Sequence, residues 1–431
     1  MSEALKVAIA GLGTVGAGTV RLLAEQADVI ALRCGRPVRV TAVSARSKGR
    51  DRGCDLGGIA WFDDPVAMAR EADADVVCEL VGGSDGAAKA VVEAAIAAGR
   101  HVVTANKALL AHHGSELAEK AEAAGVQLRW EAAVAGGIPI IKALREGLAG
   151  NRISRVYGIL NGTCNYILTI MRETGRDFAD VLADAQRLGY AEADPSFDID
   201  GVDAAHKLAL LTAVAFGTKV DFASVHVEGI RALSALDIEY AEELGYRIKL
   251  LGIARRTESG VIEQRVHPCM IRASAPIASV EDVYNAVVAE GDFVGRSVYE
   301  GRGAGAGPTA SAVAGDIIDI AAGRGAYTFG VPAKDLQPLA KCSMENHVGA
   351  YYIRLMVVDK QGVFADIAAA LRDAKVSMEA ILQRGRAPGE VVPVVLTLHE
   401  TVEASLNDAL RRITAIDGVV EPPMVIRIEA L

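Results

Sequence analysis

Short apolar runs alternate with alanine-rich stretches over the first 130 residues of the chain. The apolar runs have the length and the β-branched content of buried strands, and we expect strands at Leu5–Ala10, Arg39–Val43, Val76–Leu80, His101–Thr104 and Val126–Trp130. The stretches between them have the spacing of amphipathic helices, which we expect at Thr14–Gln26, Lys89–Ala98 and Ser115–Ala124. This alternation predicts an α/β fold, with a Rossmann-like, doubly wound parallel sheet over residues 1–130.

Longer helical patterns with fewer strands follow, and they predict a second, α+β domain over residues 131–325. We expect a strand at Arg155–Leu160, a helix at Asp177–Leu188 that ends at Gly189, and a helix from a capping Asp200 to Phe216. A glycine-dense segment, Gly301–Gly307, precedes a helix over 308–322 that we expect to pack back onto the first domain.

The C-terminal part of the chain has its own pattern. After a mixed connector over residues 326–348, we expect strand, helix, strands, helix and strand at Tyr351–Val358, Val363–Ala374, Val392–His399, Val402–Ile416 and Met424–Ile428. This order predicts a compact, separate α+β domain over residues 349–431.

Composition excludes several classes of protein. The net charge of −10 and the scattered lysines and arginines argue against a nucleic-acid partner. The apolar stretch Leu208–Phe216 is far shorter than the ~20 residues that span a bilayer, so we expect no membrane association. The first residues lack a basic region and a cleavage site, which favours the cytoplasm. The 6 cysteines lack CxxC pairing, and the histidines lack the spacing of a metal site.

A glycine loop follows the first expected strand and opens a helix. In this GLGTVG segment the first glycine permits a tight turn, the second lets the backbone approach a pyrophosphate, and the third allows close helix–strand packing. The alternative is a plain glycine-rich turn, but the strand before the loop and the helix after it favour cofactor binding. The loop residues expected to bind the cofactor are Gly11, Gly13, Thr14, Val15 and Gly16.

The end of the second strand bears on the type of dinucleotide. An NAD site would place Asp or Glu after Val43, but the chain continues with Ser44, Ala45, Arg46, Ser47 and Lys48. Arg46 and Lys48 are able to pair with a 2′-phosphate, which favours NADP(H), while tolerance of NAD(H) stays open. The alternative is a solvated basic loop.

Two further segments hold candidate catalytic groups. Thr104 and Lys107 stand at the carboxyl end of an expected parallel strand, where ligands gather in open α/β sheets. Asp203 and Lys207 are four residues apart and share one face of a largely apolar helix. An exposed ion pair is the alternative, but burial of the helix would desolvate the lysine and suit it to proton transfer.

The chain resembles the homoserine dehydrogenase family over essentially its full length. The resemblance rests on GLGTVG (11–16), VVTANKALLA (102–111), EAAVAGGIPII (131–141), NGTCNYIL (161–168), GYAEADPSFDIDGVDAAHKLALL (189–211) and GRGAGAGPTASAVAGDI (301–317). It implies NAD(P)-dependent interconversion of L-homoserine and L-aspartate 4-semialdehyde, within threonine, methionine and isoleucine biosynthesis. It also implies that residues 1–130 are the dinucleotide-binding domain and residues 131–325 the catalytic and dimerisation domain.

The resemblance also implies roles for individual residues. Lys207 is the expected proton donor and acceptor at the C4 oxygen, Glu192 and Asp203 are the expected substrate-binding carboxylates, and Lys107 is the expected lysine between cofactor and substrate. Gly307 is expected to approach the cofactor, or else to belong to a connecting turn. A monovalent cation, usually sodium, is expected at Glu131, Val134, Gly136 and Ile138, where the alternative is a plain turn.

Residues 359–367 resemble the start of an ACT domain, a ferredoxin-like module of βαββαβ order. The resemblance implies feedback control by threonine and a homodimer or homotetramer, while a purely structural ACT domain remains the alternative. Two rival functions are a non-catalytic sensor built from Rossmann and ACT parts and a dehydrogenase of another amino acid. The joint presence of Lys107, Glu192, Asp203 and Lys207 argues against the sensor.

Overall fold

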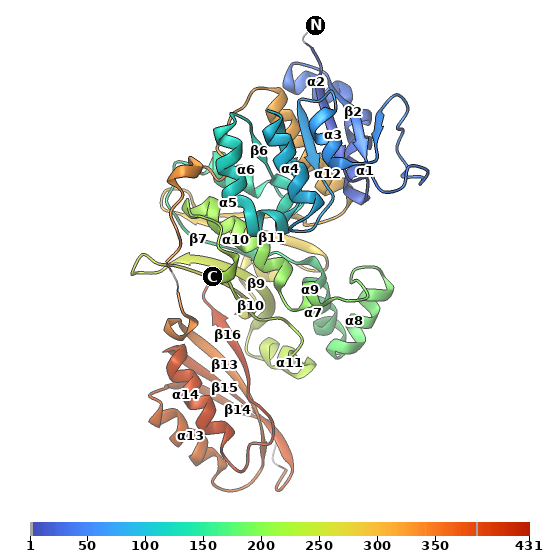
Figure 1. The fold of residues 1–431 in the computed structure, drawn as a ribbon. Coiled ribbons are helices and arrows are strands. Elements are labelled where there is room, and N and C mark those ends of the chain that lie inside the picture. The colour runs from blue at the N-terminus through green and yellow to red at the C-terminus, as the bar shows by residue number, and fades with distance from the viewer. Residues whose placement is uncertain (1–2, 341, 385–386) are drawn as a thin grey trace.

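The computed structural model describes residues 3–340, 342–384 and 387–431 of the chain. Figure 1 shows an elongated molecule in which three units follow one another along the long axis. We call them the N-terminal unit, the catalytic unit and the C-terminal unit, after the domains expected at residues 1–130, 131–325 and 349–431. Within the described ranges, no helix is both long enough and apolar enough to cross a membrane.

The N-terminal unit is built on a six-stranded sheet of order β3-β2-β1-β4-β5-β6, in which all pairings are parallel. The predicted doubly wound parallel sheet is therefore confirmed. Its strands are β1 (Leu5–Ala10), β2 (Val38–Ser44), β3 (Ala60–Phe62), β4 (Val76–Glu79), β5 (His101–Thr104) and β6 (Leu128–Arg129).

Helices cover both faces of this sheet because its central strand is apolar on both sides. Leu5, Val7 and Ile9 pack against one set of helices, while Ala8 and Ala10 pack against the other. The first set is α1 (Thr14–Glu25), α2 (Ala27–Cys34) and α12 (Ala306–Ala321); the second is α3 (Pro65–Glu71), α4 (Ala87–Ala97) and α5 (Lys107–Ala123). Helix α12 thus returns to the N-terminal unit and packs closely on α1, although it follows the catalytic sheet in the chain.

The catalytic unit places its helices mainly on one side of an antiparallel sheet that runs β12-β11-β7-β9-β10. The strands are β7 (Ile153–Ile159), β8 (His226–Val227), β9 (Tyr246–Arg256), β10 (Ile262–Arg272), β11 (Tyr284–Gly291) and β12 (Gly295–Arg302). The helices are α6 (Ile140–Lys142), α7 (Gly162–Thr174), α8 (Phe178–Arg187), α9 (Ser196–Ile199), α10 (Val202–Phe216) and α11 (Ala235–Glu243).

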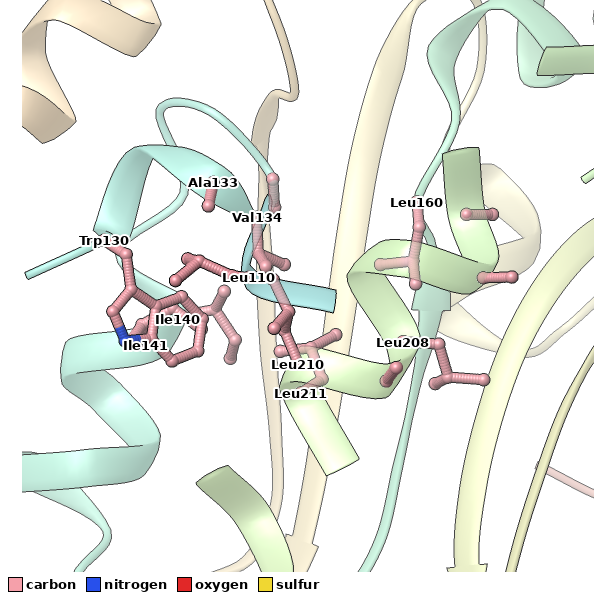
Figure 2. Close-up of a cluster of buried hydrophobic side chains, with 14 of the residues drawn as sticks. Leu110, Trp130, Ala133, Val134, Ile140, Ile141, Leu160, Leu208, Leu210 and Leu211 are labelled. Carbon is pink, nitrogen blue, oxygen red and sulfur yellow. The ribbon is translucent and has the colours of Figure 1, made fainter. Parts of the chain in front are cut away.

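A continuous apolar core joins the first two units (Figure 2). Leu208 and Leu211 of α10 are fully buried, as are Leu110 of α5 and Trp130 beyond β6. Burial of one such side chain contributes roughly 1.5–3 kcal/mol, so this core holds α10 firmly between the dinucleotide sheet and the catalytic sheet. The charged residues on α10 consequently have fixed positions.

The C-terminal unit has the order βαββαβ and an antiparallel sheet β16-β13-β15-β14, which is the ferredoxin-like topology. Its elements are β13 (Val348–Val358), α13 (Val363–Asp373), β14 (Met378–Gln383), β15 (Val391–Val402), α14 (Glu403–Thr414) and β16 (Met424–Glu429). Strand β16 also pairs in parallel with β10 at Cys269–Arg427, Met270–Ile428 and Ile271–Glu429. The catalytic sheet and the C-terminal sheet thereby join into one ten-stranded sheet.

Helix starts are where the sequence expectations fail most clearly. Helix α5 begins at Lys107, not at Ser115, because the side chain of Asn106 accepts the N–H of Leu109 and caps the helix. Helix α10 begins at Val202 and not at a capping Asp200, since Gly201 occupies the N-cap in a left-handed conformation with φ +85°. By contrast, Gly189 with φ +79° follows α8 as expected.

Candidate active site

Three charged side chains meet at the N-terminal end of α10. Asp203 and Lys207 lie one turn apart on this helix, and Lys207 Nζ donates to Asp203 Oδ2 at 2.7 Å. Lys207 Nζ also donates to the carbonyl oxygen of Leu160, again at 2.7 Å. Lys107, the first residue of α5, reaches the other oxygen of Asp203 at 2.9 Å. The structure therefore brings together the three groups predicted to be catalytic.

Burial and mutual charge shift the protonation of this cluster. Burial lowers the pKa of Lys207 below its ordinary range, although the Asp203 carboxylate opposes that effect. Burial would also lower the pKa of Lys107, but the charge of Asp203 outweighs it and raises the pKa. Burial alone would raise the pKa of Asp203, yet the two lysines hold it well below its ordinary range. Of the two lysines, Lys207 therefore loses its proton more readily and reaches the neutral form that a general base requires.

Two further residues complete the cluster, and neither was predicted as a site residue. The Asn161 side-chain amide donates to Asp203 Oδ2 at 2.9 Å and to Asp198 Oδ1 at 2.8 Å. Its oxygen caps α7 by accepting the N–H of Cys164. Burial, followed by the nearby Asp203, raises the pKa of Asp198. The signal for Asn161 was present in the sequence, because Asn before a helix-forming stretch is a strong N-cap.

A cavity of about 450 Å³ opens above the cluster. This volume suits a small metabolite together with part of a cofactor. Its walls come from α5, the β7–α7 loop, the α8–α9 loop, α10 and the loop before α12. The lining residues are Lys107, Asn161, Gly162, Thr163, Gly189, Tyr190, Asp198, Asp203, Lys207, Val283, Asn285, Arg302, Gly303, Ala304 and Gly305.

Glu192 does not belong to this lining set. Its side chain is exposed on the α8–α9 loop, and its backbone oxygen accepts a hydrogen bond from Gln186 Nε2 at 3.0 Å. Tyr190, two residues earlier on the same loop, does line the cavity. The carboxylates that line the cavity are those of Asp198 and Asp203.

The GLGTVG loop has the backbone geometry that a pyrophosphate requires. Gly11 has φ +96°, and a Cβ there would lie 2.3 Å from the carbonyl oxygen of Leu80. A Cβ at Gly16 would lie 1.9 Å from the carbonyl oxygen of Gly11, so both positions exclude any side chain. Gly13, the N-cap of α1, instead has open space on that side. The free N–H groups at the start of this 12-residue helix face an approachable surface, which fits a bound dinucleotide.

The predicted 2′-phosphate residues lie on an exposed loop. Arg46 and Lys48 are both exposed beyond the carboxyl end of β2. Arg52 shapes this loop by donating to the backbone oxygens of Ser47 and Arg50, and its guanidinium lies 5.4 Å from the centre of the Trp61 ring.

Thr104 belongs to a buried hydrogen-bond network at the carboxyl ends of β4 and β5. Its hydroxyl donates to Glu79 Oε2 at 2.7 Å and accepts the N–H of Asn106 at 3.0 Å. The other Glu79 oxygen accepts the N–H groups of Val81 and Gly82. The network orders the loop after β4 and the loop after β5, and the second of these leads to Lys107.

The predicted cation residues lie in a buried turn between the first two units. Ala135 and Gly136 are both left-handed, with φ 56° and 51°, a conformation that a non-glycine residue keeps only where its surroundings enforce it. The Glu131 carboxylate accepts the N–H groups of Ile141 and Lys142 at 2.9 and 2.8 Å. Burial, together with Asp316, raises the pKa of Glu131 to about 7.

Gly307 lies in the first turn of α12, where its exposed backbone has open space on the side of a Cβ. The preceding residue, Ala306, touches Gly18 of α1, since a Cβ at Gly18 would lie 3.1 Å from the Ala306 carbonyl oxygen. Residues 303–305 line the cavity, so this loop spans from the cavity to the helix of the dinucleotide loop.

Family models match most of the chain. A model described as homoserine dehydrogenase, NAD binding domain, matches residues 11–131, and one described as homoserine dehydrogenase matches residues 139–318. The homoserine dehydrogenase of Neisseria gonorrhoeae is 47% identical over 434 residues, covering 99% of each chain.

Solved structures agree with these matches. The crystal structure of a homoserine dehydrogenase from Thiobacillus denitrificans has a TM-score of 0.93 and 46% identity, covering 99% of this chain and 98% of that one. A hyperthermophilic archaeal homoserine dehydrogenase in complex with NADPH has a TM-score of 0.63 and 28% identity, covering 74% of this chain and 97% of its own.

The similarity extends over nearly the whole chain, both in sequence and in fold. The matched residues include the dinucleotide loop and the charged cluster on α10. The chain therefore belongs to the homoserine dehydrogenase family of NAD-binding oxidoreductases.

Proposed function

We propose that the chain interconverts L-homoserine and L-aspartate 4-semialdehyde with NADP(H) as the preferred cofactor. The observation that carries this proposal is the buried Lys207–Asp203–Lys107 cluster in a cavity whose wall continues to the helix of the dinucleotide loop. A buried lysine of lowered pKa, an anionic partner and an adjacent nucleotide site are what proton transfer coupled to hydride transfer requires.

In this mechanism Lys207 handles the proton at the C4 oxygen. When bound, the nicotinamide ring supplies the hydride acceptor for the C4 carbon of homoserine. Neutral Lys207 accepts the hydroxyl proton as the hydride leaves C4. In the reverse direction, protonated Lys207 returns this proton to the aldehyde oxygen. Asp203 stabilises the charge that forms on Lys207, and the Leu160 carbonyl fixes the direction of its Nζ.

Carboxylates around the cavity provide the partners for the substrate ammonium. Asp203 and Asp198 line the cavity, and Glu192 lies on the adjoining loop at its rim. We assign the ammonium to these three groups, of which Asp203, bound directly to Lys207, lies nearest the reacting centre. Lys107 and the N-terminal residues of α7, Gly162 and Thr163, face the same space and suit the substrate carboxylate.

Binding of the 2′-phosphate falls to Arg46 and Lys48 in this proposal. Both are exposed where β2 ends, and Ser44 stands at the strand end where an NAD site would carry an acidic residue. The archaeal relative in complex with NADPH supports the preference. Gly11, Gly13 and Gly16 shape the loop for the pyrophosphate, and Thr104 orders the loop beside the nicotinamide.

A monovalent cation such as sodium fits the turn at residues 131–138. The Glu131 side chain is buried, and the nearby buried Asp316 Oδ1 finds no hydrogen-bond partner among the described residues. The unpartnered Asp316 oxygen favours a cation, and Glu131 with the backbone oxygens of Val134, Gly136 and Ile138 offers the oxygen ligands that sodium prefers. The cation would brace the turn between the two units.

We further propose that the C-terminal unit is an ACT domain that binds threonine and inhibits the enzyme. The support is its ferredoxin-like topology and the glycine turn at Gly362, which has φ +98° and begins α13. ACT domains bind amino acids at this loop beside a neighbouring domain, so the proposal includes a homodimer or homotetramer. A structural ACT domain without an effector is the competing proposal.

The decisive experiment follows NADPH absorbance with aspartate semialdehyde as the substrate, with and without threonine. We expect oxidation of NADPH that threonine slows. A variant with Gly362→Ala, which strains the left-handed turn, should keep the basal rate and lose the inhibition. Absence of turnover would refute the enzymatic proposal, while turnover insensitive to threonine would refute only the regulatory part.

A further inference from the structure

A second buried charge cluster lies where the C-terminal unit meets the catalytic sheet. Arg427 on β16 is only 7% exposed, and its guanidinium binds two carboxylates. Its Nη2 and Nε donate to the Glu403 carboxylate of α14 at 2.5 and 3.0 Å. Its Nη1 and Nη2 donate to the Glu228 carboxylate of the catalytic unit at 2.9 and 3.0 Å. Such bidentate pairs fix direction as well as distance. The C-terminal unit thereby binds the Glu228 carboxylate, which also contacts His226 Nε2 at 2.7 Å.

Glu228 begins a stretch that is clamped against the segment joining Asp198 to Asp203. A Cβ on the next residue, Gly229, would lie 2.3 Å from the Ile199 carbonyl oxygen and 2.6 Å from the Asp200 Cα. The N–H of Ile230 donates to the same Ile199 oxygen at 2.9 Å. Backbone therefore packs on backbone, so a shift of one segment displaces the other.

The clamp has two more contacts. Arg231 forms an ion pair with Asp200, and its Nη2 donates to Ser196 Oγ at 2.8 Å. Gly201, the N-cap of α10, lies close to the carbonyl oxygen of Glu228, since a Cβ there would be 3.4 Å away. Residues 228–231 therefore hold both ends of the 196–201 segment, directly before the catalytic turn of α10.

We infer that Arg427 and Glu228 are a positioning pair that transmits the placement of the C-terminal unit to the Asp198–Lys207 segment. Neither residue touches the cavity, so both act through Gly229 and Asp200. The expected effect of this pair on turnover rests on the proposed function. Its expected effect on the order of the Asp198–Lys207 segment does not rest on that function.

Deletion of the C-terminal unit would not test this inference. Arg265 of β10 is fully buried and donates to Glu429 of β16 at 2.6 Å. Removal of β16 would leave that guanidinium without this partner in the interior, which is strongly destabilising. Point variants in the full chain are therefore required.

The experiment measures kcat for homoserine oxidation in Arg427→Met, Glu228→Gln and the double variant, together with hydrogen exchange of a peptide covering residues 196–204. The matched control is Arg384→Gln. Arg384 also joins the two units, through Glu239 and Glu243 of α11, but it lies apart from residues 228–231.

We expect each single variant to lower kcat about 3- to 30-fold and to speed exchange. The double variant should be no slower than the slower single variant, because both changes break one pair. The control should stay within about twofold of wild type, since it leaves the pair intact.

Other outcomes overturn the inference. A kcat within twofold of wild type in both single variants would do so, as would single-variant effects that multiply in the double variant. If Arg427→Met does not fold, Arg427→Lys replaces it under the same limits, because lysine keeps the charge but not the bidentate geometry. If the wild type fails to oxidise homoserine, the proposed function falls, and exchange of residues 196–204 alone decides on the positioning pair.

Discussion

The substrate cavity and the dinucleotide loop are organised in opposite ways. In the cavity, Asp203 and Lys207 have side chains only 5% and 11% exposed, and their charges are fixed by short ion pairs. At the loop, the shape comes from glycine backbone, and the charged groups, Arg46 and Lys48, are exposed. Buried charges in fixed geometry act strongly and specifically, while exposed charges are screened by water and salt. The two sites should therefore respond very differently to mutation.

Lys207→Met tests the buried side of this contrast and should have the largest effect. Loss of a positioned acid–base group lowers kcat by about 10²–10⁴-fold, while NADPH binding should stay nearly intact. Steady-state kinetics and fluorescence titration of NADPH check the two parts. Near-normal turnover would remove Lys207 from the mechanism.

The pH profile of the wild type sharpens the same point. Homoserine oxidation needs neutral Lys207, so kcat should fall as the pH drops through the pKa of this lysine. Because burial lowers that pKa, the fall should be centred below the ordinary lysine value. A profile centred at or above the ordinary value would contradict a desolvated base.

Asp198→Asn and Glu192→Gln compare a carboxylate in the cavity with an exposed one. A charge-assisted hydrogen bond contributes about 1.5–3 kcal/mol, so Asp198→Asn should raise the KM for homoserine roughly ten- to hundredfold. Glu192→Gln should raise it by less, since solvent screens its charge. A larger effect at Glu192 would mean that its loop moves inward when substrate binds.

Arg46→Asp addresses the exposed side of the comparison. It removes a phosphate partner and introduces a repelling carboxylate, so NADPH should weaken by at least about tenfold relative to NADH. The ratio of the two kcat/KM values is the measurement, and Lys48→Asp provides a second test of the same loop. An unaltered ratio would make Arg46 a solvated loop residue.

Added salt should have the smallest effect, and it should distinguish the substrate cavity from the dinucleotide loop without any mutation. Raising ionic strength shortens the Debye length to a few ångströms, which should raise the KM for NADPH about two- to threefold. The KM for homoserine should change less, because Asp203 and Lys207, at the centre of its proposed site, are buried. Equal responses would mean that the two sites do not differ in screening.

Local patterns predicted much of this molecule. The strand before Gly11 and the helix after it, the parallel sheet, and the one-turn spacing of Asp203 and Lys207 all follow from short stretches of sequence. The N-caps at Asn106 and Asn161 are equally local signals, but they were not used. The predicted start of α5 was therefore too late, and α7 was not predicted at all.

Other features depend on contacts between distant residues. Asp198 enters the site because Asn161, 37 residues earlier, binds it, while Glu192 has a similar acidic setting in the sequence but lies on the exposed part of the loop. The pairing of β10 with β16 covers three residue pairs between parts of the chain that are far apart. A hydrophobic periodicity describes a single segment of the chain. It does not show which distant segment will lie beside that segment in the folded protein.

The place of β16 has a consequence for biosynthesis. The chain leaves the ribosome from its N-terminus, and about 150 residues separate the end of β10 from the start of β16. Until β16 emerges, β10 presents an open strand edge, and such edges recruit other chains. Closing so long a loop is slow compared with forming a hairpin. Nascent chains that stall within the C-terminal unit should therefore be prone to aggregation and dependent on chaperones, even though all their cavity residues have already been synthesised.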